Sequence, residues 1–191
     1  GEDFGILAGD ALLNYAYEVM TSAVCAASPE NMKNCAGAAA VIARKAGIFG
    51  MVGGQSLDVL LTDKPVNEKE MEFIFNLKTG ALIEAAFMAG AILAGAGKEC
   101  VSQLEKAGNL VGVAFQIKDD ILDVTSTQEV LGKPVFSDEK NNKTTYVTLY
   151  GMEKAAADVE NMSEKAESIV KSIGDNEFLI ELINKLISRE K

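Results

Sequence analysis

The sequence predicts an all-α protein, and three observations support this. Its prolines are few and widely spaced, at Pro29, Pro65 and Pro134, and mark loops. No segment shows the sustained alternation of Val, Ile or Thr that is typical of strands. With 48% hydrophobic and 24% charged residues, the composition is that of a globular chain. The length of 191 residues suits one domain, residues 1–191.

The first helices are predicted from their start signals. Residues 4–27 form one helix, and the run Ser28-Pro29-Glu30 has the favoured order of an N-cap, a helix-start proline and a first-turn acid. A second helix is expected from there to about Asp58. Asn67 followed by Glu70 resembles a capping box, which opens a long helix that ends at the glycines of 95–97.

The second half of the chain is predicted as one long helix, a loop and a helical tail. The helix covers residues 98–124, and the polar segment 125–142 is the longest loop. Residues 143–191 are rich in Glu and Lys and carry two or three amphipathic helices.

One apolar run, residues 80–97, has the minimum length for a membrane span. It contains Glu84, and most of its other members are Ala and Gly, which gain little from lipid. We therefore interpret it as a buried central helix, and we expect no membrane span.

The charge composition excludes several functions. The chain has no histidine, so it cannot form a Ser-His-Asp triad or a His-ligated metal site. Its net charge is −10 and its only arginines are Arg44 and Arg189, which argues against nucleic-acid binding. The three cysteines form no CxxC pair, which favours a reducing, cytoplasmic environment over a disulfide framework.

The strongest chemical signal is the run FQIKDDILD at 115–123. On a helix, Gln116, Asp119, Asp120 and Asp123 share an arc of roughly 100°. Three carboxylates this close repel one another unless a cation neutralises them, and carboxylate oxygens without imidazole or thiolate select Mg²⁺. The alternative is a solvated acidic face, although the apolar flanks argue against simple exposure.

Two further segments could carry chemistry. Lys78-Thr79-Gly80 lies inside a predicted helix, where the glycine can loosen the hydrogen-bond ladder and turn a carbonyl dipole toward a cavity. In GGQSLD at 53–58, Gln55 and Asp58 share a helix face, and the glycines would let another helix approach closely. The ordinary explanations are a packing glycine beside a surface lysine and a helix crossing before a helix end.

A basic counterpart lies in the long loop. Lys133 precedes Pro134, and Lys143 follows two asparagines. Both lie just after the aspartate helix, where they could meet phosphates held by magnesium. Either lysine alone means little, and the order of the motifs along the chain matters more.

In that order, GGQSLD, KTG, FQIKDDILD, GKP at 132–134 and KNNKTTY at 140–146 resemble the trans-isoprenyl diphosphate synthases. The match is closest to short-chain bacterial farnesyl or geranylgeranyl diphosphate synthases. The resemblance covers essentially the whole chain. It implies an isoprenoid-synthase helical bundle, usually a homodimer, that condenses isopentenyl diphosphate with an allylic diphosphate.

The resemblance also implies roles for individual residues. Asp119, Asp120 and Asp123 would hold Mg²⁺, and Lys78, Lys133 and Lys143 would contact the allylic diphosphate. Thr79 and Gln116 would direct oxygen dipoles toward the carbocation. Gln55 and Asp58 would line the same cavity.

The family's first aspartate-rich motif and its paired arginines are not found in this chain. We therefore expect it to be the C-terminal part of a synthase, incomplete at the N-terminus and inactive alone. The rival interpretations are a non-catalytic regulatory subunit that partners an active synthase, a terpene cyclase, and a plain magnesium-binding bundle. In this family, product length depends largely on residues before the missing motif.

Overall fold

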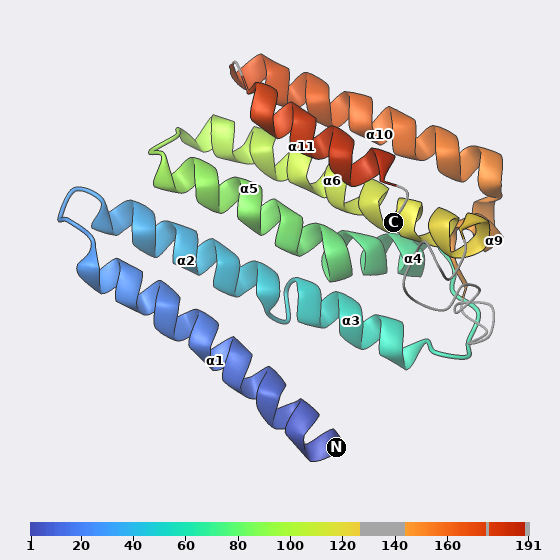
Figure 1. Ribbon diagram of the computed structural model, residues 1–191, viewed down its shortest axis with the longest axis horizontal. Coiled ribbons are helices and arrows are strands. Elements are labelled where there is room, and N and C mark those ends of the chain that lie inside the picture. Colours follow the sequence, from blue (N-terminus) through green and yellow to red (C-terminus); the bar gives the residue numbers. More distant parts are fainter. Residues whose placement is uncertain (127–143, 175, 190–191) are drawn as a thin grey trace.

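The computed structural model describes residues 1–126, 144–174 and 176–189, and these residues form helices and no strand. The elements, labelled as in Figure 1, are α1 (Glu2–Ala26), α2 (Met32–Ala46), α3 (Met51–Leu60), α4 (Glu68–Ile74), the π-helical turn η1 (Phe75–Gly80), α5 (Ala81–Leu93), α6 (Lys98–Thr125), α9 (Tyr146–Tyr150), α10 (Met152–Ile173) and α11 (Glu177–Ser188). The prediction of an all-α fold is confirmed.

The predicted helix signals are confirmed at two places. At the start of α4, Asn67 accepts a hydrogen bond from the Glu70 backbone at 3.1 Å, and the Glu70 carboxylate accepts one from the Asn67 backbone at 2.9 Å. This reciprocal pair is a capping box. The second confirmed signal is the turn between α5 and α6, which contains Gly95 with a φ of +75°, a backbone conformation that suits glycine.

Two predictions about the second helix are wrong. The second helix begins at Met32 rather than at Pro29, because Ser28 to Asn31 form a turn in which the Ser28 carbonyl accepts from the backbone of Asn31 at 2.9 Å. The stretch to Asp58 is two helices, broken between Ala46 and Met51. The break is tight, since a Cβ on Gly50 would lie 1.8 Å from the Lys45 carbonyl oxygen.

The third difference lies in the helix predicted from residue 67 to 94. It contains the π-turn η1, with the sequence FNLKTG, between α4 and α5. The local loosening that Gly80 predicts is therefore present. Such π-turns widen the helix and often occur at functional sites.

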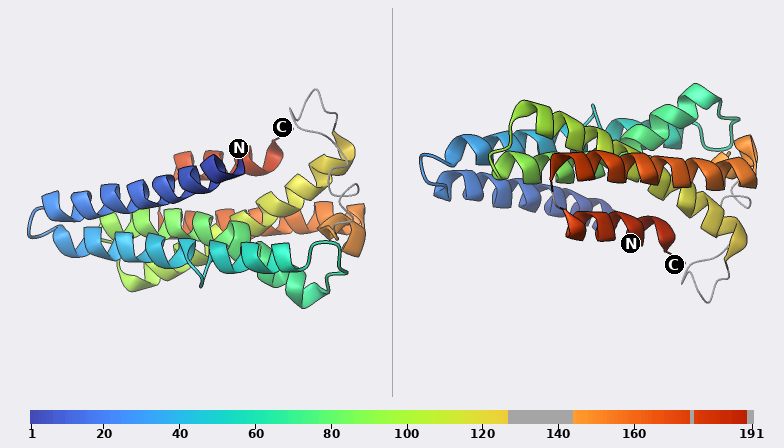
Figure 2. Two further views of the ribbon diagram at one scale, coloured as in Figure 1. Left: turned by 90° about the horizontal axis from the view of Figure 1, so that it is seen from below. Right: turned by 90° about the horizontal axis from the view of Figure 1, so that it is seen from above.

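The long helices lie roughly side by side, with α6 at the centre of the bundle (Figures 1 and 2). α6 packs against α5 and η1 on one side and against α10 on the other. Its residues Val111 and Ile117 are completely buried, as are Val170 of α10 and Ile183 of α11. α1 lies at the edge against α2, and none of its residues is buried.

Two helical stretches, 32–60 and 68–93, have the length and apolar composition of a membrane span, a test that core helices of soluble proteins also pass. The first is broken at residues 47–50, and the second contains the π-turn. Its Glu84 is buried and paired with Lys45. Packing inside the bundle accounts for part of the second stretch, whose apolar window is 39% buried, but not for the first, at 11%.

Candidate active site

The aspartate-rich segment lies at the C-terminal end of α6, and two of its three carboxylates are buried. Asp120 is 5% exposed and Asp123 is 4% exposed. A solvated acidic face is therefore excluded for these two residues. Asp119 is partly exposed and points to a different partner from that of Asp120.

Asp120 joins α6 to the start of α9. Its Oδ2 accepts a hydrogen bond from the Tyr146 backbone at 2.7 Å, and its Oδ1 accepts one from Gln116 Nε2 at 3.4 Å. α9 is held in turn by the Tyr146 hydroxyl, which donates to Asp158 of α10 at 2.6 Å. Burial, together with this bond, raises the pKa of Tyr146, so the phenol keeps its proton at neutral pH.

The π-turn η1 brings two of the predicted site residues to the other helices. Lys78 forms an ion pair with Asp58 of α3. Next to it, Thr79 Oγ1 donates to Gln116 Oε1 of α6 at 2.8 Å. Three segments that are separate in the sequence thus meet at one place, with η1 between α3 and α6.

Glycines make this meeting possible. A Cβ on Gly54 would lie 2.3 Å from the Lys78 backbone nitrogen, and one on Gly112 would lie 2.5 Å from the Gly80 Cα. Any side chain at either position would push η1 away from its neighbour. The prediction that a glycine of the GGQSLD segment allows close helix approach is confirmed for Gly54.

Gln55 is not part of this hydrogen-bond network. It is exposed on α3, one turn before Asp58, and no hydrogen bond joins it to the network in the part of the chain that the structure describes. Lys133 and Lys143 lie outside the described residues.

Arg189 contacts the aspartate-rich segment, which the sequence did not indicate. It follows α11, and its Nη2 lies 2.5 Å from Asp119 Oδ1 and 3.2 Å from the Phe115 carbonyl oxygen. Its guanidinium carbon lies 3.6 Å from the centre of the Phe115 ring, which is a cation–π distance. Only the rarity of arginine singled it out, because no local sequence pattern links two residues that are 70 positions apart.

The side chains on α6 that could bind a metal suit Mg²⁺. They offer carboxylate oxygens, which Mg²⁺ prefers, and the chain has no histidine to favour a softer metal. Among the residues with described positions, no three Asp, Glu or Cys side chains converge closely enough to hold an ion by themselves. The fit is therefore to Mg²⁺ that shares its coordination between one or two aspartates, water and substrate phosphates.

Comparisons with known proteins agree with this architecture. The chain is 38% identical over 164 residues to a farnesyl diphosphate synthase of Geobacillus stearothermophilus, covering 84% of this chain and 54% of the relative. It is 39% identical over 168 residues to a geranylgeranyl diphosphate synthase of Cyanophora paradoxa, covering 87% and 55%. The chain thus spans about half the length of these curated relatives.

Solved structures give the same result. A Helicobacter pylori geranyltransferase, solved with magnesium and isoprenyl diphosphate, superposes with a TM-score of 0.79 at 28% identity, covering 96% of this chain and 59% of that one. The fold is therefore that of the isoprenyl synthase helical bundles. The polyprenyl synthetase family model matches residues 1–183, and the chain belongs to this family.

Proposed function

We propose that this chain forms the diphosphate-binding part of a magnesium-dependent prenyl diphosphate synthase, which joins isopentenyl diphosphate to an allylic diphosphate. The observation that carries the proposal is the hydrogen-bonded chain from Thr79 through Gln116 to Asp120 of α6, with Lys78 next to Thr79 on the same π-turn. Family membership supports a prenyl transferase, and the relatives include both farnesyl and geranylgeranyl synthases. We propose the farnesyl type.

Each residue then has a proposed role. Asp119 and Asp123, with Asp120 beside them, would hold Mg²⁺, which when bound neutralises the leaving diphosphate. Lys78 would contact the same diphosphate, once it exchanges Asp58 for a phosphate oxygen, and Lys133 and Lys143 would complete the binding. Gln55 and Asp58 would line the cavity.

Thr79 and Gln116 would stabilise the allylic cation. Their side-chain oxygens lie 2.8 Å apart, and Gln116 is fixed from its other end by Asp120. Preorganised dipoles of this kind stabilise developing positive charge without reorganisation during the reaction. Isopentenyl diphosphate attacks the cation through its double bond, and the proton that is then lost would go to the released diphosphate.

Prenyl transfer would also need the first aspartate-rich motif, which residues 1–191 do not contain. We propose that this chain is inactive alone, that the complete enzyme is a cytoplasmic homodimer, and that the missing motif faces α6. A purely regulatory subunit is not favoured, because it would have no use for Lys78, Thr79 and Gln116.

Titration calorimetry tests the binding role. We expect the chain to bind pyrophosphate with Mg²⁺ and poorly without it, and we expect Lys78→Met to weaken binding at least about tenfold, as for the loss of one charge-assisted contact. The matched control is Lys98→Met, at the opposite, exposed end of α6. Mg²⁺ binding that ignores pyrophosphate would instead indicate a plain metal-binding bundle.

An assay with radiolabelled isopentenyl diphosphate and an allylic diphosphate tests the activity. We expect no product from the 191 residues alone, and product once a segment carrying the first aspartate-rich motif is supplied. Product from the isolated chain would contradict the proposed incompleteness.

A further inference from the structure

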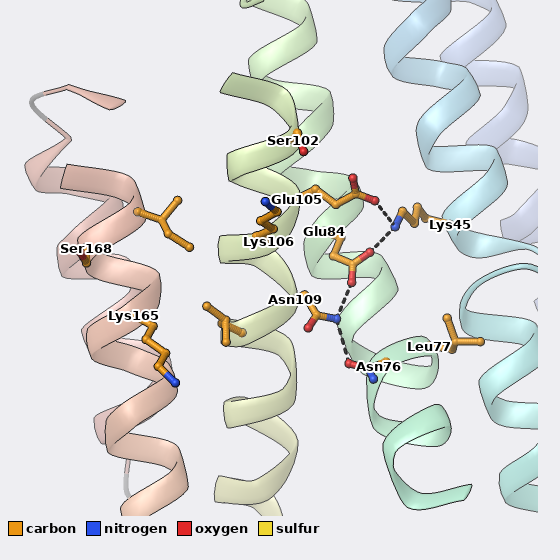
Figure 3. Close-up of a pocket in the computed structure, with 12 residues that line it drawn as sticks. Lys45, Asn76, Leu77, Glu84, Ser102, Glu105, Lys106, Asn109, Lys165 and Ser168 are labelled. Atoms are coloured by element: carbon orange, nitrogen blue, oxygen red, sulfur yellow. Dashed lines mark hydrogen bonds and ion pairs between the residues drawn. The ribbon is translucent and has the colours of Figure 1, made fainter. Parts of the chain in front are cut away.

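A second polar cluster lies away from the aspartates, on the wall of a cavity of about 790 Å³. Figure 3 shows that Lys45 of α2, Glu84 of α5 and Asn109 of α6 point toward one another, with Asn76 of η1 next to them. The role proposed above uses none of these side chains. The cluster nevertheless ends on the π-turn that carries Lys78 and Thr79.

Glu84 is the centre of this cluster. It is 7% exposed, so its charge needs partners on both oxygens. Lys45 pairs with Oε2, and Asn109 Nδ2 donates to Oε1 at 2.7 Å. Lys45 also bonds Glu105 at 2.7 Å. Although burial acts against it, the bonds to Glu105 and Glu84 raise the pKa of Lys45, so its ammonium stays charged.

Asn109 links Glu84 to the π-turn. The same Nδ2 that donates to Glu84 also donates to Asn76 Oδ1, at 2.9 Å. An amide nitrogen carries two hydrogens, so both bonds form at once. The bond to the buried carboxylate fixes the orientation of the Asn109 amide, and so directs its second hydrogen at Asn76, which lies two residues before Lys78.

The π-turn needs a contact of this kind. The π-helical pattern is rare and is found mostly as single turns inside α-helices. Next to the Asn109 amide, Gly80 lies against Gly112 of α6, where neither residue has a side chain to interlock. Two glycines set how closely η1 approaches α6, but they do not fix its rotation. Directional hydrogen bonds with α6 do: Asn76 accepts one from Asn109, and Thr79 donates one to Gln116.

We infer that Asn109 and Glu84 are positioning residues: they hold the register of the turn Phe75–Gly80 through Asn76 and thereby aim Lys78 and Thr79 into the active site. The claim that the turn serves the active site rests on the proposed function. The claim that Asn109 and Glu84 hold the turn does not, because hydrogen exchange of the turn can test it directly.

Three variants separate the links. Asn76→Ala removes the acceptor on the turn and leaves Glu84 paired with Lys45 and Asn109. Asn109→Asp keeps the side-chain volume but replaces both donors by a carboxylate beside Glu84. The double variant Glu84→Gln with Asn109→Asp keeps the wild-type net charge and reverses the hydrogen bonds. The new amide at 84 donates to the new carboxylate at 109, and the Asn76 amide, turned over, donates its Nδ2 to the same carboxylate.

The readouts are hydrogen exchange of the amides of residues 75–80 and the calorimetric affinity for pyrophosphate with Mg²⁺. We expect Asn76→Ala and Asn109→Asp to speed exchange in the turn while α10 stays protected, and to weaken binding about tenfold, a typical effect of losing a supporting hydrogen bond behind a metal site. The double variant should return to within about threefold of wild type, as reciprocal coupling requires.

Gln103→Glu is the matched control. It makes the same amide-to-acid change on α6, beside the exposed Glu99 that Gln103 contacts at 3.4 Å. It should leave exchange and affinity unchanged. If Asn109→Asp fails to fold, Asn76→Ala decides the question.

Unchanged exchange in the turn of the folded variants, unchanged affinity despite faster exchange, or no recovery in the double variant would each overturn the inference. Should the wild-type chain not bind pyrophosphate at all, the proposed function fails. The exchange data would then still decide whether Asn109 and Glu84 hold the turn.

Discussion

At the scale of single residues, the cations of this acidic chain matter more than their number suggests. Lys78 is paired with Asp58, Lys45 with Glu84, and Arg189 with Asp119. Each pair joins two different elements rather than neighbours on one helix. Arginine is scarce in this chain, but one of its two arginines, Arg189, contacts the aspartate-rich segment at Asp119.

Arg189 occupies the Asp119 oxygen that a metal would need. We predict that Arg189→Gln strengthens binding of Mg²⁺ alone, because the guanidinium at 2.5 Å competes with the ion and repels it. The gain should be at most about fivefold, since partly exposed ion pairs contribute up to about 1 kcal/mol. Calorimetric titration with MgCl₂ without pyrophosphate measures it.

Lys185→Gln is the control, because it removes the same charge from α11 at an exposed pair with Glu181. An equal gain in both variants would show a general charge effect. Weaker Mg²⁺ binding in Arg189→Gln would contradict competition and indicate that Arg189 supports the carboxylate geometry.

At the scale of elements, close helix approach decides where the site residues lie. α3 meets η1 at Gly54, and η1 meets α6 where Gly80 faces Gly112. One turn earlier on α6, Gly108 faces the backbone of Glu84, and a Cβ on Gly108 would lie 2.8 Å from the Glu84 Cα. The glycines of α3 and α6 thus bring backbones together where short polar side chains such as Thr79 must reach across.

We predict that Gly54→Ala destabilises the fold by about 1–3 kcal/mol, as overpacking against a backbone does. The added methyl would lie 2.3 Å from the Lys78 nitrogen, and a backbone cannot move aside as a flexible side chain can. Urea unfolding followed by circular dichroism measures the change.

Gly90→Ala is the matched helix-interior control. An added methyl there meets nothing within 4 Å, so the gain in helix propensity should stabilise the chain by about 0.5–1 kcal/mol. Equal stabilities of the Gly54→Ala variant and wild type would show that α3 and η1 can separate without cost.

At the scale of the whole molecule, α1 is unlike the other long helices. It has no buried residue, and its exposed apolar side chains include Phe4, Leu7, Leu12 and Tyr15. Exposed apolar surface of this extent is typical of protein interfaces. It agrees with the proposed homodimer, in which α1 would be covered.

We predict that the isolated chain self-associates through α1 and that Leu12→Lys shifts it toward the monomer, because a buried lysine without a partner opposes association. Leu12 is 70% exposed on α1, and Phe178→Lys, at a position 78% exposed on α11, is the control. Sedimentation velocity at several concentrations measures the effect. The same self-association in both variants would place the contact elsewhere.

More of the fold than of the candidate site could be predicted from the sequence. Helix type, the capping box at Asn67 and the end at Gly95 follow from local signals, and the structure confirms them. The break after Ala46 was missed, because single glycines at 47 and 50 are compatible with both a continuous and a broken helix. The boundary at Pro29 was misplaced for a similar reason, since a turn and a helix start share the same residues.

By itself, the sequence determined the all-α class and the chemistry of the site residues, because periodicity, caps and residue types act over a few positions of the chain. Only the tertiary structure decided the partners: Lys78 with Asp58, Thr79 with Gln116, and Arg189 with Asp119. These partners are 20, 37 and 70 residues apart. Their contact depends on how closely glycine lets the helices pack, which no local pattern encodes.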